Sequence, residues 1–368
     1  MAVRGPVLVM GTGLLGTSIG IGLSTRGVDV VLSDPSPTSL ALARDLGAGR
    51  LPHEAEQAEP APVLVVVAAP PDVTADVVVQ QLRRHPEAVV TDVASVKAGL
   101  LACVSSAGGD LSRYVPGHPL AGRERSGAVA ARGDLFVGRP WVLAPSPQAR
   151  PDALEAVRDV VIALGATPVV LDAAEHDEAV AVVSHVPQIA ASLVAARLRD
   201  AAPAAVALAG QGLRDVTRIA ASEPTLWVQI LGANAGRVAD VLRALRRDLD
   251  DVLTSLEQLA RADGDDAPGA RAVLARVIAA GNDGQARIPG KHGAPPTTYA
   301  TVTVVVPDRP GQLGRLFSDM GDVGVNLEDL HLEHSPGQPV GLAELSVLPA
   351  ARERLETALR ERGWTVHG

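Results

Sequence analysis

Short apolar runs alternate with longer amphipathic stretches along the first half of the chain. Each run is short enough for a single strand and has no polar face, as in a parallel sheet that helices cover on both sides. The stretches between the runs carry apolar residues at helical spacing. This alternation predicts an α/β domain with a Rossmann-type, doubly wound parallel sheet. The predicted strands are 6–10, 28–33, 63–68, 88–93, 114–117, 141–144 and 167–171, and the predicted helices are 17–26, 38–46, 73–84 and 151–164.

The pattern changes after Asp172. Segments rich in Ala, Leu, Val and Arg then recur at helical spacing, and none of them alternates as a strand would. This predicts an all-helical second domain, which we expect to bind substrate and to bury its apolar faces against a second copy of the chain in a homodimer. The predicted helices are 175–198, 204–221, 224–259 and 270–279.

The last part of the chain returns to strict alternation at 300–306. A helix, two strands, a second helix and a last strand are predicted to follow, and this order is that of a small ferredoxin-like α+β domain. A stretch rich in Gly and Pro precedes it and predicts a linker. The predicted boundaries are 1–172 for the nucleotide-binding domain, 173–281 for the helical domain, 282–298 for the linker and 299–368 for the C-terminal domain.

Composition narrows the possible partners. The 368 residues include 33 Lys and Arg against 42 Asp and Glu, for a formal net charge of −9, so nucleic acid and anionic membranes are poor partners. We expect no apolar run long enough to span a membrane. The one cysteine, Cys103, excludes an internal disulfide and a thiolate zinc site. The chain is therefore expected in a reducing compartment, the cytoplasm, with no bound metal.

The sequence Gly11-Thr-Gly-Leu-Leu-Gly16 follows the first predicted strand and opens a helix. In a dinucleotide site Gly11 would permit the tight turn, Gly13 would let a pyrophosphate approach the backbone, and Gly16 would let helix and strand pack closely. Asp34 ends the second strand at roughly the 20-residue spacing of a ribose-binding carboxylate. Because a carboxylate repels a 2′-phosphate, we predict NAD in preference to NADP. A glycine-rich turn without a ligand is the alternative. The predicted cofactor-binding residues are Gly11, Gly13, Leu14, Leu15, Gly16 and Asp34.

Two further strand ends carry candidate chemistry, because ligands of such sheets bind beyond the carboxyl ends of the strands. His118 lies between Gly117 and Pro119, and an imidazole suits a general base near neutral pH. Ser95 follows an earlier strand and is placed either to hold a substrate hydroxyl or to cap a helix. A solvated loop histidine is the alternative for His118. The role of Lys97 stays open.

These motifs together resemble those of the prephenate/arogenate dehydrogenase family of tyrosine biosynthesis. The resemblance covers roughly residues 5–280 and rests on the segments 11–16, 92–97, 117–127, 182–187 and 212–227. It implies NAD-dependent oxidation and decarboxylation of prephenate to 4-hydroxyphenylpyruvate, or of arogenate to tyrosine. A non-catalytic nucleotide or amino-acid sensor is the alternative of another class. A β-hydroxyacid dehydrogenase is disfavoured, since that group relies on a helical-domain lysine and 173–261 contain none.

The resemblance also implies roles for individual residues. His118 matches the histidine that takes the proton from the substrate's ring hydroxyl, and Ser95 the serine that hydrogen-bonds this hydroxyl. Arg218 matches the arginine that binds a substrate carboxylate, His185 a second histidine on the substrate side, and Glu124 an acid at the mouth of the pocket.

Residue types alone leave alternatives open for the substrate side. By residue type alone, Arg218 is suited to a surface ion pair with Asp215, and His185 is suited to a buried position in the hydrophobic core. The chain departs from the family pattern at Gln188, where a histidine is common. An amide both donates and accepts hydrogen bonds, so Gln188 leaves open whether the substrate side chain carries the keto group of prephenate or the ammonium of arogenate.

The C-terminal domain resembles an ACT regulatory domain over residues 299–368. The resemblance rests on 307–313 and 324–328, and it implies that Asp308, Gly311 and Asn326 contact an amino-acid effector. L-Tyrosine, the end product of the pathway, is the implied effector. A dimerisation module without a ligand is the alternative.

Overall fold

The computed structural model describes residues 3–52, 60–121, 127–261, 267–289, 298–334 and 339–367. It divides into two compact units. The first comprises Met1–Arg199 and Thr217–Ala244, and the second comprises Asp200–Val216 and Leu245–Gly368.

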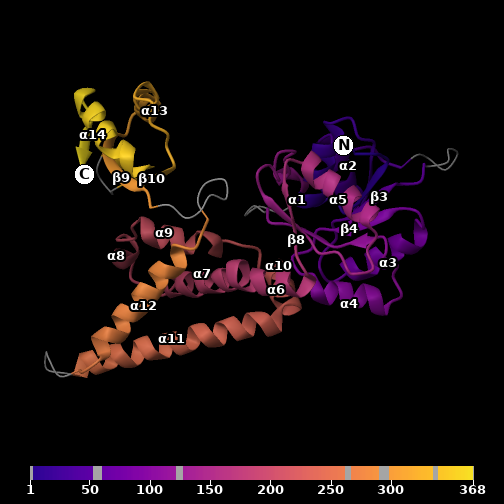
Figure 1. Ribbon diagram of the computed structural model, residues 1–368, viewed down its shortest axis with the longest axis horizontal. Helices are drawn as coiled ribbons and strands as arrows, with labels where there is room; N and C mark the ends of the chain where they lie inside the picture. The colour runs from indigo at the N-terminus through magenta and orange to yellow at the C-terminus, as the bar shows by residue number, and fades with distance from the viewer. Residues whose placement is uncertain are drawn as a thin grey trace. The chain divides into compact units, whose positions relative to one another are not determined.

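A five-stranded sheet in the first unit has the strand order β2-β1-β3-β4-β5. Figure 1 labels its strands β3 and β4, near helices α3 and α4. All its neighbouring strands run parallel, and β1 lies between β2 and β3, with Val7 opposite both Val30 and Leu64. This confirms the predicted Rossmann-type sheet. The strands are β1 Val7–Met10, β2 Val30–Ser33, β3 Leu64–Val67, β4 Val89–Asp92 and β5 Tyr114–Val115.

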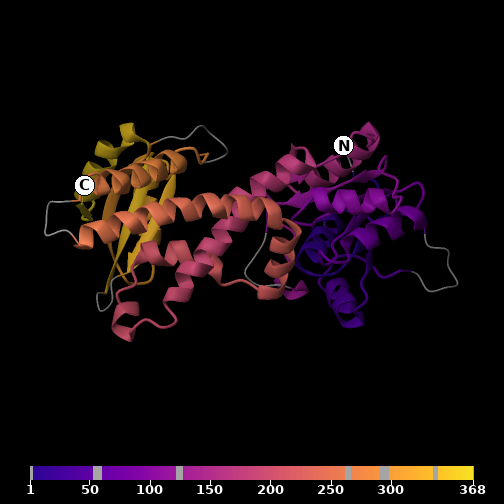
Figure 2. The ribbon, with the colours of Figure 1, turned by 90° about the horizontal axis from the view of Figure 1, so that it is seen from below.

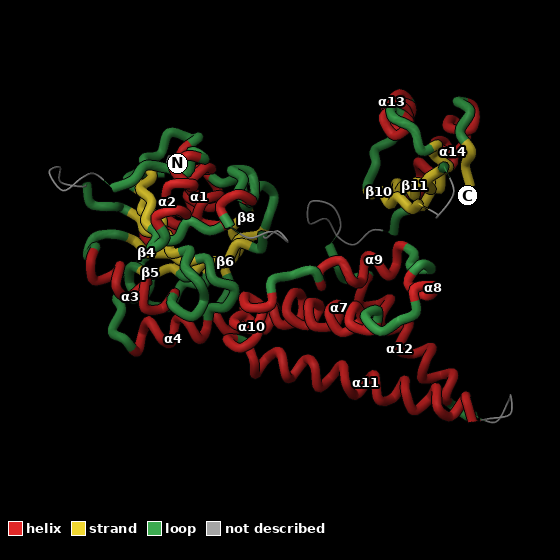
Figure 3. Tube along the Cα trace, turned by 180° about the vertical axis from the view of Figure 1, so that it is seen from behind, coloured by secondary structure: helices red, strands yellow, loops and turns green. Residues whose placement is uncertain are grey.

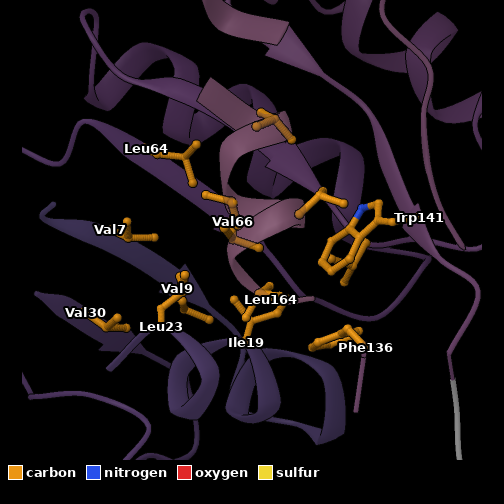
Figure 4. Packing of buried hydrophobic residues seen from close by; sticks show 14 of the residues in the cluster. Val7, Val9, Ile19, Leu23, Val30, Leu64, Val66, Phe136, Trp141 and Leu164 are labelled. Atoms are coloured by element: carbon orange, nitrogen blue, oxygen red, sulfur yellow. The ribbon is translucent and has the colours of Figure 1, made fainter. Parts of the chain in front are cut away.

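Helices cover both faces of this sheet. The apolar residues of α1 and α5 pack with β1, β2 and β3 in one buried cluster, whereas α3 and α4 pack with β3 and β4 in another. Figure 4 shows the first cluster, in which Ile19, Leu23 and Leu164 face Val9 and Val66 of the strands. The helices are α1 Leu14–Ser24, α2 Pro37–Asp45, α3 Thr74–Arg84, α4 Ala98–Ser106 and α5 Pro151–Ala163.

The later strands differ from the prediction of one continuous sheet. The predicted strand 114–117 divides at Pro116, which has no backbone N–H for a ladder, into β5 and β6 (Gly117–Pro119). Strand β6 belongs to a separate sheet of order β6-β7-β8, with β7 at Pro140–Leu143 and β8 at Thr167–Val170. In this sheet β6 runs antiparallel to β7. Because of this division, His118 lies in β6, opposite Val142 of β7, and is not part of the main sheet.

Helices joined by loops and turns follow, as Figure 3 shows. The predicted helix 175–198 contains a π-helical turn at Ala181–His185, and the predicted helix 224–259 breaks at Asn234. Helix α12 continues to Gln285, past the predicted start of the linker at 282. The elements are α6 Ala173–Val180, α7 Val186–Arg197, α8 Pro203–Val206, α9 Gln211–Thr217, the 3-10 turn η3 Arg218–Ala220, α10 Pro224–Ala233, α11 Ala235–Arg261 and α12 Ala270–Gln285.

One helical stretch, Ala173–Arg197, is long and apolar enough to cross a membrane by length and composition alone. The expectation that no run reaches this length is therefore wrong for this stretch. It also carries His176, Asp177 and His185, whose side chains are buried against other parts of the first unit. Of the most apolar 18-residue window in this stretch, 33% is buried inside the structure.

The C-terminal part of the second unit has the predicted order βαββαβ, with its strands arranged β10-β11-β9-β12 and all pairs antiparallel (Figure 2). Alternate residues of β9 are buried, among them Val302, Val304 and Val306, as the alternation predicts. The elements are β9 Ala300–Pro307, α13 Gln312–Asp322, β10 Asp329–His334, β11 Val340–Val347, α14 Arg352–Glu361 and β12 Thr365–His367.

Candidate active site

The glycine-rich turn between β1 and α1 has the geometry of a dinucleotide site. Gly11 has φ +96°, and a Cβ there would lie 2.3 Å from the carbonyl oxygen of Ala68. A Cβ on Gly16 would lie 1.9 Å from the oxygen of Gly11. A Cβ on Gly13, by contrast, would meet no atom of the described residues within 4 Å, and among these residues no side chain caps the start of α1. The turn therefore presents free N–H groups where a diphosphate would bind, and the residues present fit NAD.

The carboxylate of Asp34 is held against this turn. One of its oxygens accepts hydrogen bonds from the backbone N–H (2.7 Å) and the hydroxyl (2.9 Å) of Thr12, and the other from the N–H of Ser36 (2.8 Å). A carboxylate has about four acceptor positions, so one remains for a ribose hydroxyl. Asp34 is thus fixed beside the glycine-rich turn, and its contact with a ribose stays a prediction.

His118, which is partly buried, belongs to a chain of three polar groups whose other two members are buried. Its Nδ1 lies 2.8 Å from Nε2 of His176, and Nδ1 of His176 lies 2.8 Å from a carboxylate oxygen of Asp177. The two imidazole rings meet edge to face, with their centroids 5.1 Å apart. His176 and Asp177 lie on α6, and their side chains are almost fully buried. The first helix after the Rossmann sheet thus meets the candidate base directly.

Asp177 also caps helix α4. Its two carboxylate oxygens accept the N–H groups of Lys97 (2.8 Å) and Ala98 (2.9 Å). Burial acts to raise the pKa of Asp177, but hydrogen bonds from His176 and from these two N–H groups lower it below its usual range. The alternative interpretation of Ser95 as the helix cap is therefore wrong. Within the described ranges the Ser95 hydroxyl has no hydrogen-bond partner, so it is free to bind a substrate hydroxyl.

Lys97 is a buried cation beneath this site. Its Nζ donates to the carbonyl oxygen of Gly117 (2.6 Å) and to the carboxylate of Asp92, which also accepts the hydroxyl of Tyr114 at 2.7 Å. Burial lowers the pKa of Lys97, although the Asp92 carboxylate opposes this shift. Burial and the same carboxylate raise the pKa of Tyr114 far above its usual value. Lys97 therefore holds the backbone of the residue before His118.

The surroundings of His118 keep its imidazole neutral. Burial lowers the pKa of His118 well below its usual value, and the positive charge of Lys97 and the neighbouring His176 and His185 lower it further. A general base must be unprotonated when substrate binds, so this electrostatic setting suits that role.

His185 ends the π-helical turn and is buried. Its Nδ1 lies 3.2 Å from the amide nitrogen of Asn234, which also donates to the carbonyl oxygen of Asp177 (2.7 Å), and its ring packs edge-on to Trp227. Burial lowers the pKa of His185, so the ring is neutral. These contacts agree with the core interpretation of His185 and leave its Nε2 as its remaining polar atom.

Gln188 and Arg218 lie on neighbouring elements, because η3 packs against α7. Gln188 is buried, and its side-chain oxygen accepts from the hydroxyl of Ser222 at 3.4 Å. Arg218 begins η3 with an exposed side chain. Glu124 lies outside the described residues.

Two domains known from other proteins match this chain. The nucleotide-binding domain of prephenate dehydrogenase matches residues 19–170, and the dimerization domain of prephenate dehydrogenase matches residues 172–266. The chain belongs to the prephenate dehydrogenase family. Within this family, the probable prephenate dehydrogenase NovF of Streptomyces niveus is 42% identical over 360 residues, which are 97% of this chain and 98% of that relative. The prephenate dehydrogenase of Bacillus subtilis is 28% identical over 351 residues, covering 92% of this chain and 91% of the relative.

A solved structure of the same family supports the fold. The prephenate dehydrogenase of Aquifex aeolicus, in complex with hydroxyphenyl propionate and NAD+, superposes with a TM-score of 0.63 and 26% identity. The superposition covers 75% of this chain and 97% of that chain.

Sequence reasoning missed His176 and Asp177. Both follow the sheet domain directly and precede a long apolar helical run, and two adjacent ionisable residues at such a place were the available signal. The contact of His176 with His118 joins residues 58 positions apart, which no local pattern reveals.

The C-terminal domain holds a surface pocket of about 370 Å³. Asp308 and Gly311 line it, together with Leu332 and Gly341. The side chain of Asn326 instead donates to Glu328 at 2.6 Å and does not line this pocket. The structure thus gathers two of the three predicted effector contacts.

Replacing Lys97 tests the buried cation. In Lys97→Met the Asp92 carboxylate loses its buried counter-ion, so we expect the free energy of unfolding to fall by about 3–5 kcal/mol in urea denaturation. Arg158→Met is the control, because Arg158 makes an exposed ion pair with Glu155 and its loss should cost less than about 1 kcal/mol. Equal unfolding midpoints for both variants would contradict the assignment of Lys97 as a structural counter-ion.

Proposed function

We propose that this chain catalyses the NAD-dependent oxidative decarboxylation of prephenate to 4-hydroxyphenylpyruvate and CO2. The observation that carries the proposal is a neutral, oriented imidazole, that of His118, in a chain of this family. The glycine turn and Asp34 supply a fitting site for the cofactor. Arogenate, which would give tyrosine directly, is the alternative substrate.

The reaction needs a base but little other chemical assistance. Loss of a hydride from C4 and of the ring carboxylate as CO2 makes the ring aromatic, which supplies the driving force. The nicotinamide ring of bound NAD supplies the hydride acceptor. His118 takes the proton of the C4 hydroxyl through Nε2 and returns it to the phenol product, and Ser95 hydrogen-bonds that hydroxyl. A positioned base of this kind contributes about 10²–10⁴-fold to the rate.

The substrate's carboxylates require a cationic partner. In this proposal Arg218 supplies it, since a guanidinium grips a carboxylate at two points. Gln188 and His185 complete the substrate side in this proposal. The family resemblance alone assigns Glu124, which is outside the described residues, to its mouth. This assignment is supported by the packing of η3, which carries Arg218, against α7, which carries Gln188.

Turnover of separate substrates tests the proposal. We expect NADH formation from prephenate with NAD, and much slower reduction of NADP, because Asp34 repels a 2′-phosphate. Arogenate and prephenate are offered separately with each cofactor, and absorbance at the nicotinamide band is followed. Turnover of arogenate alone would contradict the substrate assignment while leaving the base and cofactor sites intact. Absence of turnover under conditions where NAD binds would favour the sensor alternative.

The helical part supports a homodimer. The chain matches a dimerization domain over 172–266, and large apolar side chains are exposed on α7, on α10 and on the π-helical turn, as expected where a second copy packs. These side chains are Val182, Val183, Leu193, Val194, Leu226 and Val228.

Charged substitutions among these exposed apolar side chains test the homodimer. We expect the native chain to sediment at twice its monomer mass and the double variant Val183→Glu/Leu193→Glu to sediment as a monomer, because two buried carboxylates per chain are costly. The matched control is Ile162→Glu, at an exposed apolar position of α5. A native monomer, or a dimer that tolerates both charges, would contradict this interface.

The C-terminal pocket is proposed to bind L-tyrosine as a feedback effector. Its volume accommodates an amino acid, and the Asp308 carboxylate is a suitable partner for an ammonium group. We expect Asp308→Ala to weaken tyrosine binding roughly tenfold in titration calorimetry, as the loss of one charge-assisted hydrogen bond would. Asp322→Ala, at the far end of α13, is the control. Binding that Asp308→Ala leaves unchanged would place tyrosine elsewhere.

A further inference from the structure

His176 and Asp177 are buried ionisable groups for which the proposed reaction assigns no task. Their side chains are each only 1% exposed, which is costly unless every polar atom is paired. They pair with each other, and His176 also pairs with His118, the candidate base. The chain of contacts therefore leads from His118, the candidate base for the substrate hydroxyl, to the buried carboxylate of Asp177.

The contacts determine which ring nitrogens carry protons. Asp177 already accepts hydrogen bonds from two backbone N–H groups, so it is ionised and accepts a third hydrogen bond, from Nδ1–H of His176. Nε2 of neutral His176 is then an acceptor. Nδ1 of His118, 2.8 Å away, must donate to it. This leaves Nε2 of His118 unprotonated, as a base for the substrate hydroxyl requires.

Positive charge is better placed on His176 than on His118. Burial, Lys97, His176 and His185 all disfavour a charged His118. His176 instead contacts the carboxylate of Asp177 at 2.8 Å. His185 offers no second outlet through its Nδ1, because that atom faces the amide nitrogen of Asn234 and the ring packs against Trp227.

We propose that His118, His176 and Asp177 form a proton relay. As Nε2 of His118 takes the proton of the substrate hydroxyl, the proton on Nδ1 of His118 passes to Nε2 of His176. His118 is then neutral, with its proton on Nε2, and His176 is an imidazolium paired with the Asp177 carboxylate. After CO2 has left, both transfers reverse and the phenol oxygen regains its proton, so no proton is gained or lost. His176 is thus a positioning and relay residue that acts through His118, and this inference rests on the proposed function.

Two substitutions at His176 separate relay from simple packing. Glutamine keeps an oxygen acceptor for the Nδ1 proton of His118 but cannot take up that proton, whereas leucine removes the acceptor. We expect kcat for prephenate to fall about 10–100-fold in His176→Gln and about 10²–10³-fold in His176→Leu, within the range that general-base catalysis supplies. KM and the affinity for NAD should change little. Asp177 is left intact, because it also caps α4.

The matched control is His85→Gln, which removes an imidazole from the same unit at the end of α3 and should keep full activity. Thermal unfolding and NAD titration of each variant show whether it is folded. Wild-type kcat in folded His176→Gln would overturn the relay, because an acceptor that cannot be protonated would then suffice.

Nitrogen NMR of the histidines in the full-length native enzyme gives a readout that needs no turnover. We expect both His118 and His176 to carry their proton on Nδ1, with assignments from His118→Gln and His176→Gln. A proton on Nε2 of His176 that is donated to Nδ1 of His118 would overturn the relay. Failure of the native enzyme to oxidise prephenate would overturn the proposed function instead, and the tautomer result would still decide the direction of the hydrogen bonds.

Discussion

The buried carboxylate of Asp177 is the interaction on which the site depends. It caps α4 of the nucleotide-binding sheet through two N–H groups and orients His176 through a third hydrogen bond. One side chain thus joins the start of the helical part to the loop after β4, where Ser95 lies, and to the imidazole of the candidate base. A buried charge with three donors is well compensated, whereas the same charge without them would be costly.

A second buried pair supports the site from the other side. Lys97 and Asp92 neutralise each other, and Lys97 also holds the carbonyl of Gly117. Because the ammonium group lies close to His118, it makes protonation of that ring unfavourable. The same cation therefore holds the backbone beside the candidate base and favours the neutral form of its imidazole. On the far side of His176, the negative charge of the Asp177 carboxylate offsets the positive charge of Lys97.

Local patterns in the sequence predicted much of the fold. Buried parallel strands, the glycine turn and the alternation of β9 each follow from a periodicity or from a residue type, and the structure confirms them. Two of the predictions that failed concern interruptions of a pattern. Pro116 ends a strand that looks continuous, and Asn234 divides a long helical segment. At these two points the missing N–H of Pro116 and the buried side chain of Asn234 outweigh the average preference of the segment. Helix α12, by contrast, runs past its predicted end.

The sequence by itself determined the family and the nucleotide-binding turn and named the candidate base, because each depends on residues that are close together in the chain. The tertiary structure alone decided what surrounds that base. His176 contacts His118 across 58 positions, and Asp177 contacts Lys97 across 80. Such contacts arise where a helix start packs against the edge of a sheet, and they set burial, tautomer and charge. Those properties depend on distance in space, which the order of residues does not encode locally.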